Sequence, residues 1–147
     1  MEGLLDKELI LSDLQSAKKD SVLEEMVSAL VKHMPELESE TVQKILLERE
    51  SLGTTGIGDG VAIPHAKLST LEEMVLVVGR STIGVDYEAL DDNPCNIFFM
   101  VLAPESAAGA HLKLLAAISR LLKNENFRDE FMKAPDGDAL FELLKAR

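Results

Sequence analysis

Two nearly unbroken apolar runs constrain the fold of this chain more than any other feature. Residues 74–80 and 96–103 are rich in Val, Leu, Ile and Phe, with few polar positions between them. Strands that are covered on both faces have this pattern, whereas a strand with one solvated face alternates apolar and polar residues. The runs therefore predict central strands of a small sheet in an α/β domain, with helices on both faces.

The remaining sequence can supply those helices. Ser21 and Glu24 fit a capping box at the start of a first helix, and Pro35 follows its end. Ser39 is placed to cap a second helix that carries Arg49 near its end. Helical spacing predicts three more helices, near residues 108–123, 126–133 and 137–146. The first of these three is expected to bury Leu112, Leu115, Ile118, Leu121 and Leu122.

A glycine-rich segment lies between the second helix and the first apolar run. Glycines at positions 53, 56, 58 and 60 argue against a helix over residues 51–60 and predict a shaped loop. Backbone amides in such a loop, beside Thr54 and Thr55, suit an anion. Residues 61–65 predict a short strand, which Pro64 confines to a sheet edge or a strand end.

Length and composition exclude several classes of protein. The 147 residues predict one domain, and 46% hydrophobic residues exclude a disordered chain. A net charge of −11 argues against nucleic acid or an anionic membrane as partner, because both require a basic surface. The acidic excess falls within residues 1–100, where it suits either a basic protein partner or simple solubility. The chain shows no signal-peptide pattern and no apolar run near 20 residues, so we expect a cytoplasmic protein without membrane insertion.

Few residues can carry chemistry. The single cysteine, Cys95, excludes an intramolecular disulfide, and its apolar neighbours predict a buried, inert thiol. The histidines at 33, 65 and 111 lack metal-binding spacing, and no P-loop or dinucleotide-binding glycine motif occurs. We therefore expect neither a metal nor a cofactor. His33, near the C-terminal end of the first helix, is expected to be structural because the helix dipole favours a cation there.

The other two histidines allow two interpretations. His65 follows Pro64 at the end of a predicted strand, and His111 opens the long helix on its core side. Taken singly, each is more typical of a histidine that makes one core hydrogen bond. Taken together, they predict two imidazoles that face each other across a site.

Several short runs resemble the enzyme IIA domain, type 2, of the bacterial phosphotransferase system (PTS), the fructose, mannitol and nitrogen-regulatory class. They are RESLG at 49–53, GIG at 56–58 and AIPH at 62–65. Later runs, LAPE at 102–105 and HL at 111–112 followed by LA at 115–116, resemble the second half of that family. The resemblance covers nearly the whole chain and implies one α/β domain, 1–147, with a mixed sheet between helices.

The resemblance also implies a function and a site. Members of this family are phosphocarriers that take a phosphoryl group from the phosphohistidine of the carrier protein HPr and pass it to a IIB component. His65 matches the phosphorylated histidine, Arg49 the arginine beside it, and His111 the second active-site histidine. Position 66 is Ala where many members have Gly, which is a mild departure from the pattern.

Three functions remain open at this point. The first is a phosphocarrier in sugar uptake, and the second is a nitrogen-regulatory type of phosphoprotein that binds targets according to its phosphorylation state. The third is a binding module that keeps the fold without phosphoryl transfer. The intact set of Arg49, His65 and His111 counts against the third.

Overall fold

Strand β6, Cys95–Pro104, is the central strand of a six-stranded mixed sheet in the computed structural model, which describes residues 1–147 apart from the side chain of Glu2. Strand β5, Val75–Val85, pairs antiparallel with one edge of β6. Two short strands, β3 (Val61–Ala62) and β4 (His65–Leu68), run parallel along its other edge. The outer strands are β1 (Ile10–Leu11), parallel to β5, and β2 (Gly56–Gly58), antiparallel to β3.

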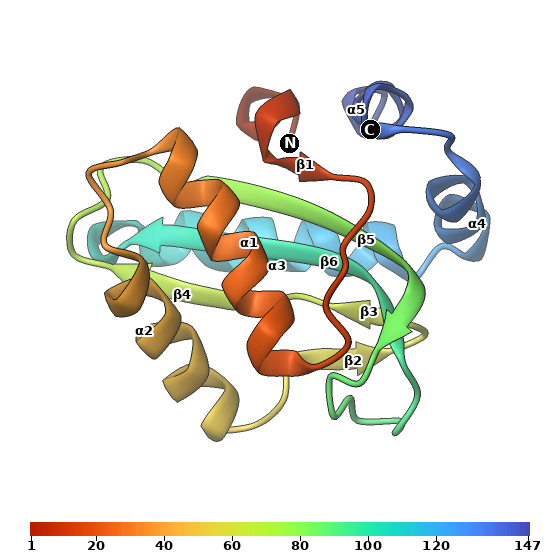
Figure 1. Cartoon of the computed structure of the whole chain (residues 1–147). Helices are drawn as coiled ribbons and strands as arrows, with labels where there is room; N and C mark the ends of the chain where they lie inside the picture. Colours follow the sequence, from red (N-terminus) through yellow and green to blue (C-terminus); the bar gives the residue numbers. More distant parts are fainter.

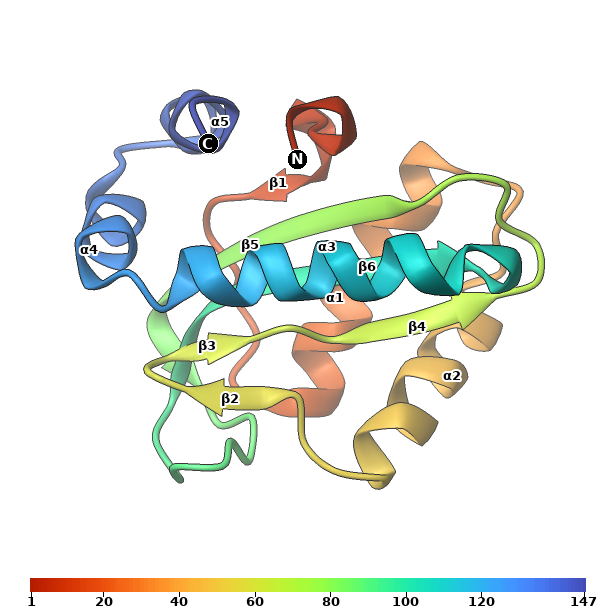
Figure 2. The ribbon, with the colours of Figure 1, turned by 180° about the vertical axis from the view of Figure 1, so that it is seen from behind.

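Helices cover both faces of this sheet, as the apolar runs predict. Helices α1 (Lys19–His33) and α2 (Ser39–Ser51) lie on one face (Figure 1). Helix α3 (Ala108–Leu122) crosses the opposite face, and α4 (Glu125–Lys133) and α5 (Gly137–Lys145) follow it towards the β1 edge (Figure 2). Three short 3-10 helices complete the chain: η1 (Glu2–Leu4), η2 (Lys7–Leu9) and η3 (Glu105–Ala107). No described helix is both long enough and apolar enough to cross a membrane.

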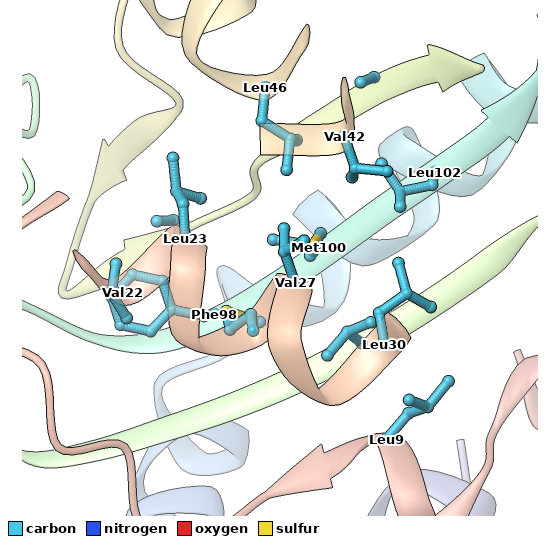
Figure 3. Close-up of a cluster of buried hydrophobic side chains, with 14 of the residues drawn as sticks. Leu9, Val22, Leu23, Val27, Leu30, Val42, Leu46, Phe98, Met100 and Leu102 are labelled. Carbon is cyan, nitrogen blue, oxygen red and sulfur yellow. The ribbon is translucent and has the colours of Figure 1, made fainter. Parts of the chain in front are cut away.

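From Ile97 onwards the central strand is apolar at every position, because its two faces belong to two cores. Alternate residues Phe98, Met100 and Leu102 pack with α1 and α2 (Figure 3). The residues between them, Ile97, Phe99 and Val101, pack with α3, α4 and α5. Side chains alternate across a strand, so a strand between two helical layers needs apolar residues at every position. This confirms the predicted α/β domain.

Both predicted helix caps were displaced from the observed helix starts. Helix α1 begins two residues before Ser21, whose hydroxyl donates to the Lys18 carbonyl (3.1 Å), so the capping box of Ser21 and Glu24 is wrong. The chain at Lys18 is paired with Asp86, and the Lys19 amide donates to the Asp86 carbonyl (3.1 Å). The helix therefore starts where the chain leaves this tertiary pairing. Ser39 is the first residue of α2 and not its cap, which is Glu38.

The buried face of α3 differs from the prediction at Leu112 and Leu114, whereas His111, Ile118 and Leu122 are buried as predicted. His111, Leu114, Ile118 and Leu122 are buried, whereas Leu112 is 68% exposed. The buried residues recur at intervals of three or four, so they form one stripe along the helix. Leu115 and Leu121 flank this stripe and are partly buried.

The glycine-rich segment and the strand after it are more regular than predicted. Ser51 is still helical, and residues 56–58 form β2. The predicted strand 61–65 is divided: β3 ends at Ala62, and the chain resumes pairing at His65 as β4. Pro64 lies in this break, and its carbonyl accepts a hydrogen bond from the Val101 amide (2.9 Å), which keeps both short strands aligned on β6. The two-residue strand β1 is too short for its sequence pattern to reveal.

Gly56 tests how closely the chain packs around β2. A Cβ atom at this position would lie 2.8 Å from Ala89 Cβ and 2.9 Å from Ala89 Cα, and a backbone atom cannot move aside as a flexible side chain can. We expect Gly56→Ala to lower the free energy of unfolding by about 1–3 kcal/mol in thermal unfolding. Gly109→Ala is the control, because a Cβ there meets nothing within 4 Å, and its melting temperature should not fall. Equal melting temperatures for the two variants would contradict this packing.

Candidate functional site

His65 is the first residue of β4, and its side chain points towards the layer that contains α3. Ala66 and Leu68 point into the core beneath α1 and α2, so the alternation of the strand directs His65 and Lys67 to the other face. The imidazole is half-buried, and its Nδ1 lies 2.8 Å from the carbonyl oxygen of Ile63. A carbonyl only accepts hydrogen bonds, so Nδ1 carries the proton in the neutral ring and Nε2 keeps its lone pair.

His111 meets His65 from the first turn of α3. The two ring centroids are 5.7 Å apart, with the planes at 73°, so the rings lie edge to face. His111 is 4% exposed, and its Nε2 is buried without a hydrogen-bond partner among the described residues. Buried polar atoms are nearly always paired, so an unpaired nitrogen beside a second imidazole marks His111 as a candidate functional residue.

Arg49 reaches the same place from the last turn of α2, which packs against β4. One guanidinium nitrogen donates to the carbonyl of Gly53 (2.8 Å), which ties the side chain to the loop that follows the helix. Arg49, His65 and His111 line one cleft of about 490 Å³, together with Lys67. The structure thus brings together all three residues that the resemblance implied.

The surroundings of both imidazoles lower their pKa values and so favour the neutral ring. Burial lowers the pKa of His65, and the charge of Arg49 lowers it further, against opposing effects of the Ile63 carbonyl and Glu50. Burial also lowers the pKa of His111, and so do the charge of Lys67 and the charge that His65 carries when it is protonated. Both groups therefore lose their proton below the ordinary histidine pKa of about 6.5. A neutral imidazole with a free Nε2 is a nucleophile at neutral pH.

The arrangement suits transfer of a phosphoryl group. His65 Nε2 has the free lone pair that a nucleophile needs, and Arg49 in the same cleft carries a planar cation whose geometry matches phosphoryl oxygens. Electropositive groups around the cleft would stabilise the charge of a phosphoryl group, which spreads over its equatorial oxygens during transfer.

Several backbone amides of the glycine-rich segment donate hydrogen bonds within the protein. The amides of Gly53, Thr55 and Gly56 donate to Glu50 O, Glu50 Oε1 and Thr54 Oγ1 respectively. The predicted anion surface beside Thr54 and Thr55 is therefore wrong for these amides, because the loop uses them to hold its own shape.

Two charged residues of this region were not singled out from the sequence. Lys67 lies two residues after His65 on the same face of β4, so the period of a strand predicts its position once the strand is known. Glu50 follows Arg49 and is buried, and it continues the stripe of Val42 and Leu46 at helical spacing, which separates it from the exposed glutamates of α2.

Two further residues match their structural predictions. His33 lies at the end of α1, where Nε2 is 2.8 Å from Asp6 Oδ2 and Nδ1 is 2.7 Å from Glu8 Oε2. The hydrogen bond to Glu8 raises the pKa of His33, and Asp6 adds to this effect. Each carboxylate lies beside a different ring nitrogen, so the pair stabilises the protonated form of His33. Cys95 is fully buried, and burial raises its pKa to about 12, which makes the thiol inert.

Relatives of one kind match this chain over nearly its whole length. Residues 3–147 match the family model described as "Phosphoenolpyruvate-dependent sugar phosphotransferase system, EIIA 2". A "PTS system fructose-specific EIIABC component" of Bacillus subtilis is 38% identical over 96% of this chain, and the chain spans 22% of that protein's length. A "Nitrogen regulatory protein" of Pseudomonas aeruginosa is 34% identical over 98% of this chain and 94% of its own length.

Solved structures share the fold. The nitrogen regulatory protein IIA-Ntr of Neisseria meningitidis has a TM-score of 0.91 at 27% identity, with 97% of each chain covered. The mannitol enzyme IIA of Escherichia coli, solved in a complex with phosphorylated enzyme IIB, has a TM-score of 0.77 at 21% identity, with 97% of this chain and 98% of that chain covered, which supports the fold alone. From the family match over residues 3–147 and the relatives above 30% identity, the chain belongs to the EIIA type 2 family of the phosphoenolpyruvate-dependent sugar phosphotransferase system.

Proposed function

We propose that this protein is a cytoplasmic phosphocarrier that accepts a phosphoryl group from an HPr-type phosphohistidine on His65 and passes it to a IIB component. The observation that carries the proposal is the pair of imidazoles 5.7 Å apart in one cleft, with the Nε2 lone pair of His65 left free by the bond from Nδ1 to Ile63. Family membership supports the same reaction.

The transfer requires one bond to form and one to break. The Nε2 lone pair of His65 attacks phosphorus, and the P–N bond to the donor imidazole breaks with its electrons returning to the donor nitrogen. The hydrogen bond from Nδ1–H to the Ile63 carbonyl stabilises the positive charge that His65 acquires as its Nε2 becomes bonded. Onward transfer reverses these roles, with the His65 imidazole as leaving group.

Arg49 and His111 supply the charge and the hydrogen bonds. Arg49 donates to the phosphoryl oxygens with the guanidinium nitrogens that the Gly53 carbonyl does not use. His111, in the tautomer protonated at Nε2, donates to a third oxygen from a nitrogen that is otherwise buried and unpaired. Neither group moves a proton during the transfer, so their contribution is electrostatic.

The rim of the cleft suits a protein partner. Leu52 and Leu112 are 84% and 68% exposed and line the cleft with His65. The exposed Ile57 lines a neighbouring pocket that shares Arg49 and His65 with this cleft. Exposed apolar side chains around a reactive group are typical of a docking surface for another protein. An HPr-type donor and a IIB acceptor would both dock here.

Regulation is the second candidate function. The Pseudomonas aeruginosa relative named as a nitrogen regulatory protein aligns with this chain over 94% of its own length. In this role the phosphorylated and free forms would bind different target proteins through the same rim. Rapid loss of the phosphoryl group to a fructose-type IIB protein would support transport, whereas no transfer to it would support regulation.

Incubation with phosphoenolpyruvate, enzyme I and HPr tests the acceptor. We expect intact mass to rise by one acid-labile phosphoryl group, and His65→Gln to abolish the gain. His111→Gln keeps a donor of similar reach, so it should still accept the group, more slowly, with a larger loss in onward transfer. Full phosphorylation of His65→Gln, or a stable phosphoryl group on His111 in that variant, would reverse the assignment.

Arg49→Ala tests the charge of the cleft. We expect phosphorylation to slow by about ten- to a hundredfold, which corresponds to about 1.4–2.8 kcal/mol of lost transition-state stabilisation. The melting temperature should change little, because the side chain is only half-buried and, among the described residues, it bonds only to the Gly53 carbonyl. A normal rate or an unfolded variant would show that Arg49 has a different role.

The pKa of His65 can be measured directly by ¹⁵N NMR titration in buffer without phosphate. We expect a midpoint below 6.5, so that the ring is neutral and nucleophilic at pH 7, with the proton on Nδ1. Arg49→Gln should raise the midpoint, since it removes a positive charge that disfavours protonation. His33 is the internal control and should titrate above 6.5. A His65 midpoint above 6.5 would contradict the burial of its ring.

A further inference from the structure

Glu50 and Lys19 form a buried ion pair directly behind the candidate site. Lys19 Nζ lies 3.1 Å from Glu50 Oε1, and the two side chains are 12% and 4% exposed. Charged side chains of this kind are rarely buried unless they are paired, and burying them is expensive. The reaction proposed above uses neither residue, so the position of the pair calls for another explanation.

The carboxylate of Glu50 holds the glycine-rich loop through Thr55. The amide of Thr55 donates to Glu50 Oε1 (3.0 Å), and its hydroxyl donates to Glu50 Oε2. Lys19 supports the same loop from the other side, because its Nζ donates to Thr54 Oγ1 (3.3 Å) and lies 4.8 Å from the centre of the Tyr87 ring. Thr54 and Thr55 are therefore fixed by one buried pair of charges.

From this loop, one line of hydrogen bonds leads to His65. The carbonyl of Thr55 accepts from the amide of Ile63 (3.0 Å), and the carbonyl of Ile63 accepts from Nδ1 of His65 (2.8 Å). The second of these bonds selects the tautomer that leaves Nε2 free. The position of the Ile63 carbonyl, and with it the tautomer of His65, is thus set by where Thr55 is held.

A second line leads to Arg49. The amide of Gly53 donates to the carbonyl of Glu50 (3.1 Å), and the carbonyl of Gly53 accepts from the guanidinium of Arg49 (2.8 Å). Gly53 adopts a φ of +152°, so the chain turns sharply between Glu50 and Thr55. The side chain of Glu50 closes this turn, because it bonds to Thr55 on the far side of it.

We propose that Glu50, paired with Lys19, is the positioning residue of the site: it holds the loop 53–55 so that the Gly53 and Ile63 carbonyls orient Arg49 and His65. This inference rests on the phosphocarrier function proposed above. A carboxylate suits the role because its two oxygens only accept hydrogen bonds, and here they meet the Lys19 ammonium and both donors of Thr55. An amide would turn an NH₂ group towards one of these donors.

The test uses Glu50→Gln and Thr55→Val, with phosphoramidate as a small phosphoryl donor. A small donor removes any effect of the docking surface on the rate. We expect His65 of both variants to become phosphorylated about ten- to a hundredfold more slowly than His65 of the wild-type protein, because misplaced reacting groups slow a reaction by such factors. Long-range ¹H–¹⁵N spectra should show a smaller fraction of the Nδ1–H tautomer of His65, a change that loss of stability alone does not produce.

Asp136→Ala is the matched control for stability. Asp136 caps α5 by accepting from the Ala139 amide (2.9 Å), so its removal destabilises the fold at the β1 edge and leaves the loop intact. The rate of phosphorylation and the tautomer of His65 in this variant should match those of the wild-type protein. If Glu50→Gln does not fold, Thr55→Val provides the test, because it removes the hydroxyl bonds of Thr55 to Glu50 and Tyr87 and leaves no buried charge unpaired.

The outcomes separate this inference from the function on which it rests. If the wild-type protein does not acquire a phosphoryl group on His65, the proposed function is wrong. If it does, and a folded Glu50→Gln or Thr55→Val variant keeps the normal rate and tautomer, the positioning role is wrong. Equal slowing in Asp136→Ala would likewise contradict it, because the effect would then follow stability and not the loop.

Discussion

The burial of β6 on both faces is the constraint on which the rest of this structure depends. Its alternate side chains enter two separate cores, and its two edges pair with β5 on one side and with β3 and β4 on the other. A strand in this position needs helices above and below it, which is why the chain returns across the sheet as α3 after β6. The sheet in turn fixes where β4 lies, and therefore where His65 is presented.

The candidate site lies where three independently anchored elements meet. The strand β4 presents His65, the first turn of α3 presents His111, and the last turn of α2 presents Arg49. Each of these side chains comes from the end of a rigid element, and the loop that connects α2 with β2 is held by buried charges. Reactive groups that must be placed to within a fraction of an ångström are best supported in this way.

The sequence predicts the layers of this fold better than its boundaries. Continuous apolar runs revealed β5 and β6, and helical spacing located all five helices. The cap of α1 was misplaced because a tertiary pairing at Lys18 decides where that helix starts. The cap of α2 was misplaced by one residue. Leu112 was assigned to the core because its apolar side chain fits the helical spacing, but it lies on the exposed face of α3, whereas the polar His111 lies within the buried stripe. The three residues of the site were found through motifs. Glu50 lies in the same RESLG run and at the helical spacing of the buried Val42 and Leu46, but its role was not predicted because its partner Lys19 is far away in the chain.

The position of Cys95 has a practical consequence for studying this protein. It is the single cysteine of the chain, it lies in the central strand, and its thiol is both shielded and protonated at neutral pH. A thiol reagent reaches such a group only when the sheet opens. The rate at which a thiol reagent modifies the native cysteine therefore reports how often the sheet opens. In the folded state Cys95 does not react, so a cysteine introduced on the surface can be labelled selectively.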